Sequence, residues 1–180
     1  CSSDLRSKVD VELVDKHLGF PVVVKTISGS QGSGVFLAEN RLNFIDLLEM
    51  INAYKENATM ILQEFVASSR GVDLRVLTIG GRAIAAMKRS SGNDSFKANY
   101  SRGGYVEPYE ITPEIEWLAL EAARLLNLDI AGIDLLFDGD HFKICEANSS
   151  PGFEGLESCC QANIAEEIYN FLRVRLNAFE

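Results

Sequence analysis

The sequence has no apolar run long enough to span a bilayer, and its first residues, CSSDLRSK, lack the apolar core of a signal peptide. We therefore expect a cytoplasmic protein that does not bind a membrane. A basic excess is also missing, because 17 lysines and arginines face 26 aspartates and glutamates, giving a formal net charge of −9. General affinity for nucleic acid needs a basic surface and is not expected. Any phosphate group must then be held by a local basic cluster or by metal ions.

Side chains for nucleophilic catalysis or zinc binding are scarce. The two histidines, His17 and His141, have no nucleophile or metal-ligand partner nearby in the sequence. The four cysteines lack the paired C-x-x-C spacing of a zinc site. Cys145 fits a buried reduced thiol, and the adjacent Cys159 and Cys160 are either a redox pair or, as we favour, small residues that open a helix. The chemistry that remains is that of metals and phosphate.

The stretch PVVVKTISGSQGSGV, residues 21–35, combines a valine run, a lysine and a glycine-rich segment. The three valines before Lys25 predict a buried strand, and Gly29, Gly32 and Gly34 allow backbone N–H groups to approach a ligand closely. The lysine precedes the glycines, which excludes a P-loop, and the G-x-x-G-x-G spacing before a second strand excludes a Rossmann fingerprint. The segment is either an ordinary hairpin turn or a loop that covers phosphate.

The rest of the chain reads as alternating helices and strands. Its 180 residues, 47% hydrophobic and 24% charged, fit one domain or two small lobes. The Gly80-Gly81 pair predicts a two-residue hairpin, and residues 90–108 form a polar stretch that is functional or disordered. Hydrophobic spacing predicts helices at about 9–18, 42–54, 113–126 and 160–176, and strands at about 22–24, 35–38, 60–66, 73–79, 83–89, 130–137 and 142–147.

Two acidic residues interrupt the apolar strands predicted at 130–137 and 142–147. If the loop between them has three residues, 138–140, then Asp134 and Glu146 project from the same face as diagonal neighbours, roughly 7–8 Å apart at the backbone. Asn148 lies two residues beyond Glu146 and adds a neutral oxygen to that face. Two carboxylates and an amide suit Mg²⁺. The alternative is that the two carboxylates form ion pairs with lysines or arginines.

Basic side chains gather on and around the strands predicted at 73–79 and 83–89. Phosphoryl transfer needs positive charge spread over the γ-phosphate oxygens, and cations and metal ions supply it together. Taken singly, each of these residues is better explained as solvated or ion-paired. The residues concerned are Arg75, Lys88, Arg89, Lys97 and Arg102.

Several motifs occur in a fixed order along the chain: VVVK, the glycine segment, QEFV, GVDLRV, AAMKR, FKANYSRGG, AGIDLL and CEANSSPGFEGLE. From residue 20 onward the sequence resembles the ATP-grasp superfamily, and within it the RimK-type α-L-glutamate ligases. The resemblance implies an α+β ATP-grasp fold, in which two α+β lobes with mainly antiparallel sheets enclose ATP. It also implies a small lobe at residues 1–66, a large lobe with the metal site at 67–180, and absence of the family's N-terminal domain.

The resemblance also implies roles for individual residues. Lys25 would contact the ATP phosphates, the glycine segment would close over them, and Asp73 would lie near the ribose. Lys97 stands where arginine is common, so a bidentate contact would become a point charge. The implied ATP-binding residues are Lys25, Gly29, Gly32, Gly34, Gln63, Glu64, Phe65, Val66, Asp73, Lys97 and Asn99; the catalytic candidates are Arg75, Arg89 and Arg102; the magnesium ligands are Asp134, Glu146 and Asn148.

The activity implied by the resemblance is amide-bond formation driven by ATP and Mg²⁺, with Mn²⁺ as an alternative metal. ATP phosphorylates a carboxylate, an amine attacks the acyl phosphate, and phosphate leaves. The partners would be ATP, a carboxylate acceptor such as a protein C-terminus or a small acid, and an amino-acid donor such as glutamate; a homo-oligomer is left open. Two other functions stay open: an ATP-binding fragment or regulatory module without catalysis, and a ligase of carrier-protein or glutathione-like biosynthesis. Residues 90–108 and 149–157 would govern acceptor specificity.

Overall fold

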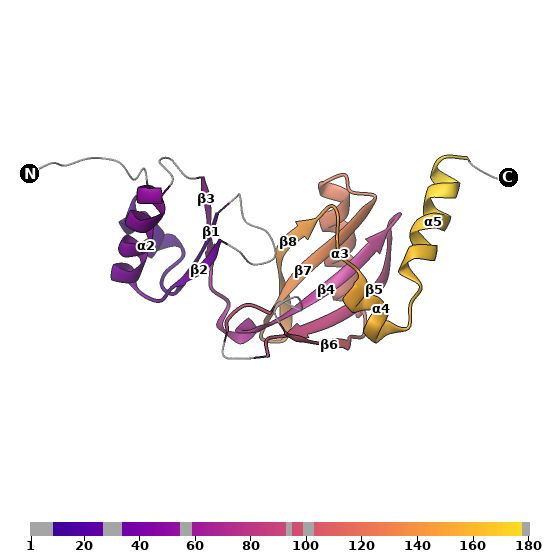
Figure 1. Ribbon diagram of the computed structural model, residues 1–180, viewed down its shortest axis with the longest axis horizontal. Coiled ribbons are helices and arrows are strands. Elements are labelled where there is room, and N and C mark those ends of the chain that lie inside the picture. The colour runs from indigo at the N-terminus through magenta and orange to yellow at the C-terminus, as the bar shows by residue number, and fades with distance from the viewer. Residues whose placement is uncertain (1–8, 27–33, 55–58, 93–94, 99–102, 178–180) are drawn as a thin grey trace, which may run out of the picture. The chain divides into compact units, whose positions relative to one another are not determined.

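The computed structural model describes residues 9–26, 34–54, 59–92, 95–98 and 103–177. The chain divides into two compact units, Cys1–Phe65 and Val66–Glu180, which we call the N-terminal and C-terminal units. Both combine helices with antiparallel sheets (Figure 1). No helix among the described residues is long and apolar enough to cross a bilayer. The predicted α+β class with mainly antiparallel sheets is confirmed.

The N-terminal unit is a three-stranded sheet covered by helices. Its elements are α1 (Val11–His17), β1 (Val22–Thr26), β2 (Val35–Ala38), α2 (Arg41–Tyr54) and β3 (Met60–Glu64), and β1 is the central strand, antiparallel to both neighbours. Phe44 and Leu48 of α2 pack with Val22 and Val24 of β1, as the three- and four-residue spacing of apolar residues in α2 predicts. The valine run is therefore a buried strand, as predicted from its β-branched residues.

In its described residues, the C-terminal unit is a five-stranded antiparallel sheet with three helices and one 3₁₀ turn, η1 (Ala67–Ser69). The strand order is β6-β5-β4-β7-β8. The Gly80-Gly81 turn joins β4 to β5 with two residues, because Ile79 pairs with Arg82, and this prediction is confirmed. The elements are β4 (Val72–Ile79), β5 (Arg82–Ser90), β6 (Tyr105–Pro108), α3 (Pro113–Leu125), β7 (Ile130–Asp138), β8 (His141–Asn148), α4 (Glu154–Cys160) and α5 (Ile164–Arg175).

The two faces of this sheet are covered differently. On one face, Leu74 and Val76 of β4 and Ile133 and Leu135 of β7 pack against Ile115 of α3, and all five are fully buried. Part of the other face is covered by α4 and α5. There, Leu77 and Ile79 of β4 and Met87 of β5 pack with Leu156 of α4 and Ile164 of α5. Because side chains alternate along a strand, the neighbours of Leu74, Val76, Ile133 and Leu135 point to the face opposite α3. That alternation places the charged residues of the candidate site there.

The hairpin between β7 and β8 differs from the prediction. Its turn has two residues rather than three, since Asp138 pairs with His141. A bulge then follows in β8, because Leu135 pairs with Ile144 and Asp134 pairs with Glu146, which leaves Cys145 as the extra residue. Asp134 and Glu146 are thus directly opposite each other on one face, not diagonal. The predicted loop length was wrong by one residue, and the bulge restores the shared face.

The end of the chain also differs from the prediction. The helix predicted at about 160–176 is present as α5, Ile164–Arg175, but it starts about four residues later than predicted. A separate helix, α4, was missed; it ends at Cys160, and Gln161 then adopts a left-handed conformation with φ of 51°. The side chain of Asn163 then caps α5 by accepting a hydrogen bond from the backbone N–H of Glu166, with an N–O distance of 3.1 Å. Cys159 and Cys160 therefore end a helix instead of opening one.

The stretch 90–108 is also more ordered at its end than predicted. Residues 105–108 form β6, an edge strand in which Val106 pairs with Arg89. This strand has only four residues, too few for an alternation of apolar and polar residues to be recognised. Its last residue is a proline, which is tolerated at a sheet edge because its missing N–H faces outward.

We expect Gly80→Ala to destabilise the protein more than Gly81→Ala. Both glycines have positive φ, +56° and +77°, and this conformation costs an alanine about 1 kcal/mol. A Cβ at Gly80 would also lie 2.6 Å from a ring carbon of Phe171 on α5, whereas nothing lies within 4 Å at Gly81. The overlap should add about 1–3 kcal/mol to the loss, measured by urea unfolding. Equal losses in the two variants would show that Phe171 moves aside without cost.

Candidate functional site

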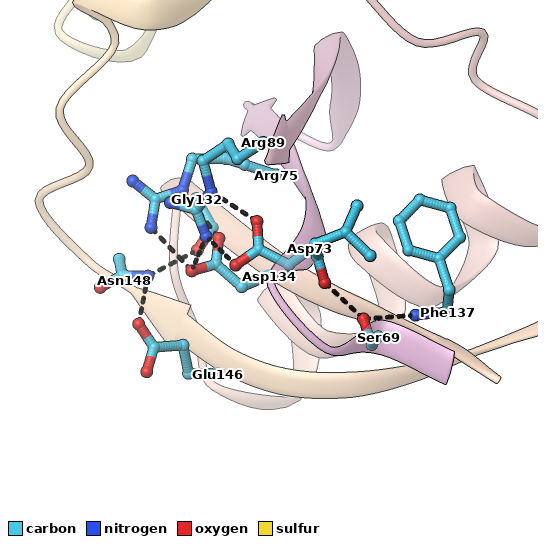
Figure 2. A network of polar contacts seen from close by, with 10 residues as sticks. Ser69, Asp73, Arg75, Arg89, Gly132, Asp134, Phe137, Glu146 and Asn148 are labelled. Atoms are coloured by element: carbon cyan, nitrogen blue, oxygen red, sulfur yellow. Dashed lines mark hydrogen bonds and ion pairs between the residues drawn. The ribbon is translucent and has the colours of Figure 1, made fainter. Parts of the chain in front are cut away.

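Four charged side chains form a connected network on the face of the large sheet opposite α3 (Figure 2). The guanidinium of Arg75 donates two hydrogen bonds to Asp134, with N–O distances of 2.7 Å for both. The guanidinium of Arg89 donates two to Asp73, at 2.6 and 2.7 Å, and a third to Asp134 at 2.8 Å. Arg89 therefore bridges two carboxylates, and Asp134 accepts bonds from two arginines.

The register of three strands brings these side chains together. Asp73 of β4 pairs with Arg89 of β5, and Arg75 of β4 pairs with Asp134 of β7. Asp73 and Arg75 are two residues apart on β4, so they share a face. The network is thus built from two cross-strand pairs that are next to each other. Opposite charges placed directly across a sheet attract, and each pair favours this register over a one-residue slip.

The network is buried, and its charges balance. The side chains of Arg89 and Asp134 are 7% and 5% exposed, and those of Asp73 and Arg75 are 16% and 15% exposed. Burying an isolated charge is costly, but two carboxylates and two guanidiniums neutralise each other through charge-assisted hydrogen bonds. Removal of one member would leave a buried charge without its partner.

The surroundings shift the pKa values of the network in different directions. Burial alone would raise the pKa of Asp134, but the hydrogen bonds and charges of Arg75 and Arg89 outweigh it and hold that pKa below its usual value. For Asp73, burial is the largest effect and outweighs the attraction to Arg89, so its pKa rises from 3.8 to about 6. Burial also acts on Arg89, but Asp134 and Asp73 outweigh it and raise the pKa of the guanidinium. Arg89 therefore stays charged.

Glu146 and Asn148 extend the site toward the sheet edge. The amide nitrogen of Asn148 donates to a carboxylate oxygen of Glu146 and to the carbonyl oxygen of Gly132, with distances of 3.3 Å for both. Glu146 is exposed, and it pairs directly with the buried Asp134 across the hairpin. Figure 2 shows the three side chains on neighbouring positions of β7 and β8. This part of the site is open to solvent.

The oxygen donors of this group fit a hard divalent cation. Asp134 and Glu146 supply carboxylates from one face of the hairpin, and Asn148 supplies an amide oxygen, the ligand types that Mg²⁺ prefers. Three hydrogen bonds from arginines already reach Asp134, and a carboxylate offers about four acceptor positions. A cation would therefore share Asp134 with the arginines or replace one of them. Within the described part of the chain, no three His, Cys, Asp or Glu side chains are placed to hold a metal.

The segment after β8 folds back over β7. A Cβ at Gly132 would lie 2.7 Å from Cβ of Pro151 and 3.7 Å from Nε of Arg75, so this position accepts no larger residue without movement. Sequence reasoning did not select Gly132 or Pro151. The available signal was a single glycine inside an apolar strand, which often marks a close approach of another backbone segment.

Ser69 is a second residue that sequence reasoning missed. Its hydroxyl donates to the carbonyl oxygen of Val72 at 2.5 Å and accepts from the backbone N–H of Phe137 at 3.1 Å (Figure 2). It is 6% exposed. The hydroxyl therefore joins the start of β4 to the end of β7, beside the charged network. The sequence around it, Ser68 to Gly71, predicts only a turn.

The other predicted ATP-binding residues lie in several elements. Lys25 is on β1, opposite Val35 and Ile61. Gly34 has φ of 76°, and its carbonyl oxygen accepts from the backbone N–H of Thr26 at 2.8 Å. Gln63 and Glu64 are on β3, followed by Phe65 and Val66; Gly29, Gly32, Asn99 and Arg102 lie outside the described residues.

Two of the basic residues have partners outside the network. Lys88 forms an ion pair with Glu107 of β6, at 2.8 Å. The ammonium of Lys97 lies 5.5 Å from the ring centre of Phe96, within the range of a cation–π contact. Lys88 is therefore ion-paired, which is the explanation that the sequence favoured for each basic residue taken singly.

A protein-family model described as "RimK-like ATP-grasp domain" matches residues 5–172. The chain belongs to the RimK-like ATP-grasp family. It is 40% identical over 166 residues to the "Probable alpha-L-glutamate ligase 2" of Shewanella frigidimarina, which covers 92% of this chain and 55% of that protein. This ATP-grasp chain therefore spans about half the length of the curated relative.

Solved structures agree on the fold. The D-alanine–D-alanine ligase of Bacillus anthracis matches 96% of this chain and 60% of its own, with a TM-score of 0.71 and 19% identity. The ATP-grasp ligase PsnB, in a structure with a precursor variant, Mg and ADP, matches 93% of this chain and 51% of its own, with a TM-score of 0.68 and 22% identity. The predicted ATP-grasp fold and RimK-type resemblance are confirmed.

Arg89→Gln should destabilise the RimK-like domain far more than Lys88→Gln. The first change leaves two buried carboxylates without their shared donor, which should cost about 3–5 kcal/mol. The second change removes the partly exposed ion pair between Glu107 and Lys88, the residue that precedes Arg89 on the same strand. This loss should cost at most about 1 kcal/mol. Urea unfolding of both variants measures the difference. Similar losses would show that Arg89 is not a structural bridge.

Asp73 should make stability depend on pH in a defined direction. Because its pKa is about 6 in the folded chain and 3.8 ordinarily, the folded carboxyl keeps its proton between these values while the unfolded one releases it. The stabilising contribution is thus complete below pH 3.8 and is lost as the pH rises through 6, by up to about 3 kcal/mol. Unfolding of the wild type and Asp73→Asn at a series of pH values measures it. A constant difference between the two proteins would contradict the assignment.

Proposed function

We propose that this chain forms the ATP-binding and catalytic part of an ATP-dependent carboxylate–amine ligase. The observation that carries the proposal is the pairing of Asp134 with Glu146, extended by Asn148 and flanked by two arginines, in a RimK-like ATP-grasp domain. A set of oxygen donors beside fixed cations suits the transfer of a phosphoryl group, which depends on positioning and charge neutralisation more than on a covalent nucleophile.

Asp134, Glu146 and Asn148 are the proposed metal ligands. A bound Mg²⁺ would neutralise phosphate charge and orient the reacting oxygens. Asn148 holds the carboxylate of Glu146 in place through its amide N–H. The proposal is supported by the donor chemistry and by the PsnB structure, which is a complex with Mg and ADP.

Arg75 and Arg89 are proposed to act through Asp134. Each donates to its carboxylate, so they fix its orientation and keep it ionised. This role differs from direct contact with a γ-phosphate or an acyl phosphate, which the resemblance implies for Arg89. Arg102 is the further cation proposed to reach the transferred phosphoryl group.

The remaining nucleotide contacts follow the family pattern. Lys25 and the glycine segment are proposed to bind phosphates, residues 63–66 to bind adenine, and Asp73 to approach the ribose. Lys97 and Asn99 complete the proposed set. In each case the support is the matching position in a family whose relatives are named ligases.

Glutamate is the proposed amine donor, and a carboxylate on a peptide or small acid is the proposed acceptor. The support is the 40% identical relative, which is named a probable α-L-glutamate ligase. ATP phosphorylates the acceptor carboxylate, the amine of glutamate attacks the acyl phosphate, and phosphate departs with formation of the amide. The competing function is an ATP-binding module without ligation.

The test is isothermal titration of the chain with a non-hydrolysable ATP analogue, with and without Mg²⁺, followed by assays for phosphate release with ATP, glutamate and candidate carboxylates. Binding and glutamate-dependent phosphate release support the ligase. Binding without phosphate release for any acceptor favours the module. Absence of nucleotide binding contradicts the proposal.

Glu146→Gln should weaken magnesium-dependent nucleotide binding by about tenfold or more, because one charged metal ligand is lost. Stability should change little, since Glu146 is exposed. Glu116→Gln is the matched control, because Glu116 is an exposed residue of α3, which covers the opposite face of the sheet. Titration with and without Mg²⁺ compares the three proteins. Equal affinities for the wild type and Glu146→Gln would exclude Glu146 as a ligand.

A further inference from the structure

Two adjacent thiols lie at the end of α4. The sulfur atoms of Cys159 and Cys160 are 3.4 Å apart. The thiol of Cys160 donates to the carbonyl oxygen of Ala86 on β5 at 3.3 Å, and the thiol of Cys159 donates to the carbonyl oxygen of Leu156 at 3.8 Å. Both residues are partly exposed. Neither belongs to the charged network of the proposed ligase site.

Both thiols line a cavity of about 450 Å³ in the C-terminal unit that is largely open to solvent. Its other walls include apolar side chains of β5 and of the segment around β6, namely Ile84, Pro108, Tyr109 and Ile111. The volume falls in the range of about 300–1,000 Å³ that small-molecule sites occupy. The cavity lies at the β5–β6 edge of the sheet, and Asp134 and Glu146 lie on β7 and β8 at the other end of the strand order.

We propose that Cys159 and Cys160 form a dithiol site for a monosubstituted trivalent arsenical, with the organic substituent placed in the adjacent cavity. The sulfurs already lie close enough for one atom to bond to both. A disulfide is less well suited, because successive Cα atoms are about 3.8 Å apart and disulfides usually need about 4.4–6.8 Å. The sulfurs would also have to approach from 3.4 Å to about 2.05 Å.

The number of protein ligands at this site limits which metal or metalloid compound the two thiols can bind. Structural zinc takes four protein ligands, but no cluster of three His, Cys, Asp or Glu side chains occurs in the described ranges. A monosubstituted trivalent arsenical has two exchangeable hydroxyl groups and one carbon substituent. Two sulfurs complete its coordination, so it needs no third protein ligand. The substituent requires an apolar space next to the thiols, and the cavity provides one.

The binding step is an exchange without a change in oxidation state. Two As–O bonds break and two As–S bonds form, and each thiol proton leaves with a hydroxyl group as water. Burial, and after it the hydrogen bond and charge of the neighbouring Cys159, together raise the pKa of the Cys160 thiol to about 12. Cys160 is therefore protonated at neutral pH. The exchange accepts a protonated thiol, because its proton departs in the water that forms.

The test uses phenylarsine oxide, whose hydrate has the required two hydroxyl groups. Titration into the wild-type chain should give one adduct per protein by intact-mass spectrometry, with two fewer thiols open to alkylation by iodoacetamide. Cys159→Ser and Cys160→Ser should each weaken binding by at least about 100-fold, because the second bond is then no longer intramolecular. Cys145→Ser is the matched control, since Cys145 lies on β8, and it should bind like the wild type.

Thermal unfolding of each variant checks that it is folded, and alanine variants at the two positions replace any serine variant that is not. The affinities of the protein for the phenyl arsenical and for its methyl analogue give a phenyl-to-methyl ratio. Dithiothreitol, a small dithiol without a cavity, gives the reference ratio. The ratio of the protein should be about tenfold higher, because the phenyl group enters the cavity. Undiminished binding in a folded Cys160→Ser or Cys160→Ala protein, loss of one thiol per adduct, or a ratio equal to that of dithiothreitol would overturn the proposal.

Discussion

The ion pairs of Arg89 are the interaction on which the C-terminal unit depends most. One guanidinium holds two buried carboxylates, Asp73 and Asp134, that come from different strands. The arrangement exists only when β4, β5 and β7 are in the observed register, because a one-residue slip would turn these charges into the apolar layer under α3. Electrostatics and core packing therefore select the same alignment of the sheet, and the site and the fold are specified together.

Asp134 connects this structural network to the proposed chemistry. It is held by Arg75 and Arg89 on one side and faces Glu146 directly across the hairpin on the other. A single bulge at Cys145 creates that pairing. Bulges often re-aim side chains beside functional sites, and here the extra residue brings an exposed carboxylate opposite a buried one. As a proposed metal ligand, an Asp134 carboxylate held this firmly would need little reorganisation on cation binding.

The face opposite α3 is divided between two tasks. Where α4 and α5 cover it, apolar side chains of β4 and β5 form part of the core. Beyond that cover, β4, β5 and β7 carry the charged network, and the proposed metal ligands lie on β7 and β8. The close approach of Pro151 to Gly132 lies beside Arg75 at this border. Within a few residues the chain thus passes from β8, which carries two of the proposed metal ligands, to α4, which ends in the proposed dithiol site. The two proposed sites lie at different parts of the sheet.

The sequence by itself determined the periodic features and one turn: the apolar stripe of α2, the buried valines of β1 and the Gly80-Gly81 hairpin. The shared face of Asp134 and Glu146 was predicted from a three-residue loop, whereas in the structure it results from a two-residue turn and the bulge at Cys145. The sequence could not determine the bulge at Cys145, the break at Gln161 or the short strand β6, because each is a local irregularity of one to four residues that a periodicity does not register. The sequence also could not identify the two carboxylates that pair with Arg89. They lie 16 and 45 residues away in the chain, and only the tertiary pairing of three strands decides which carboxylates a buried arginine must neutralise.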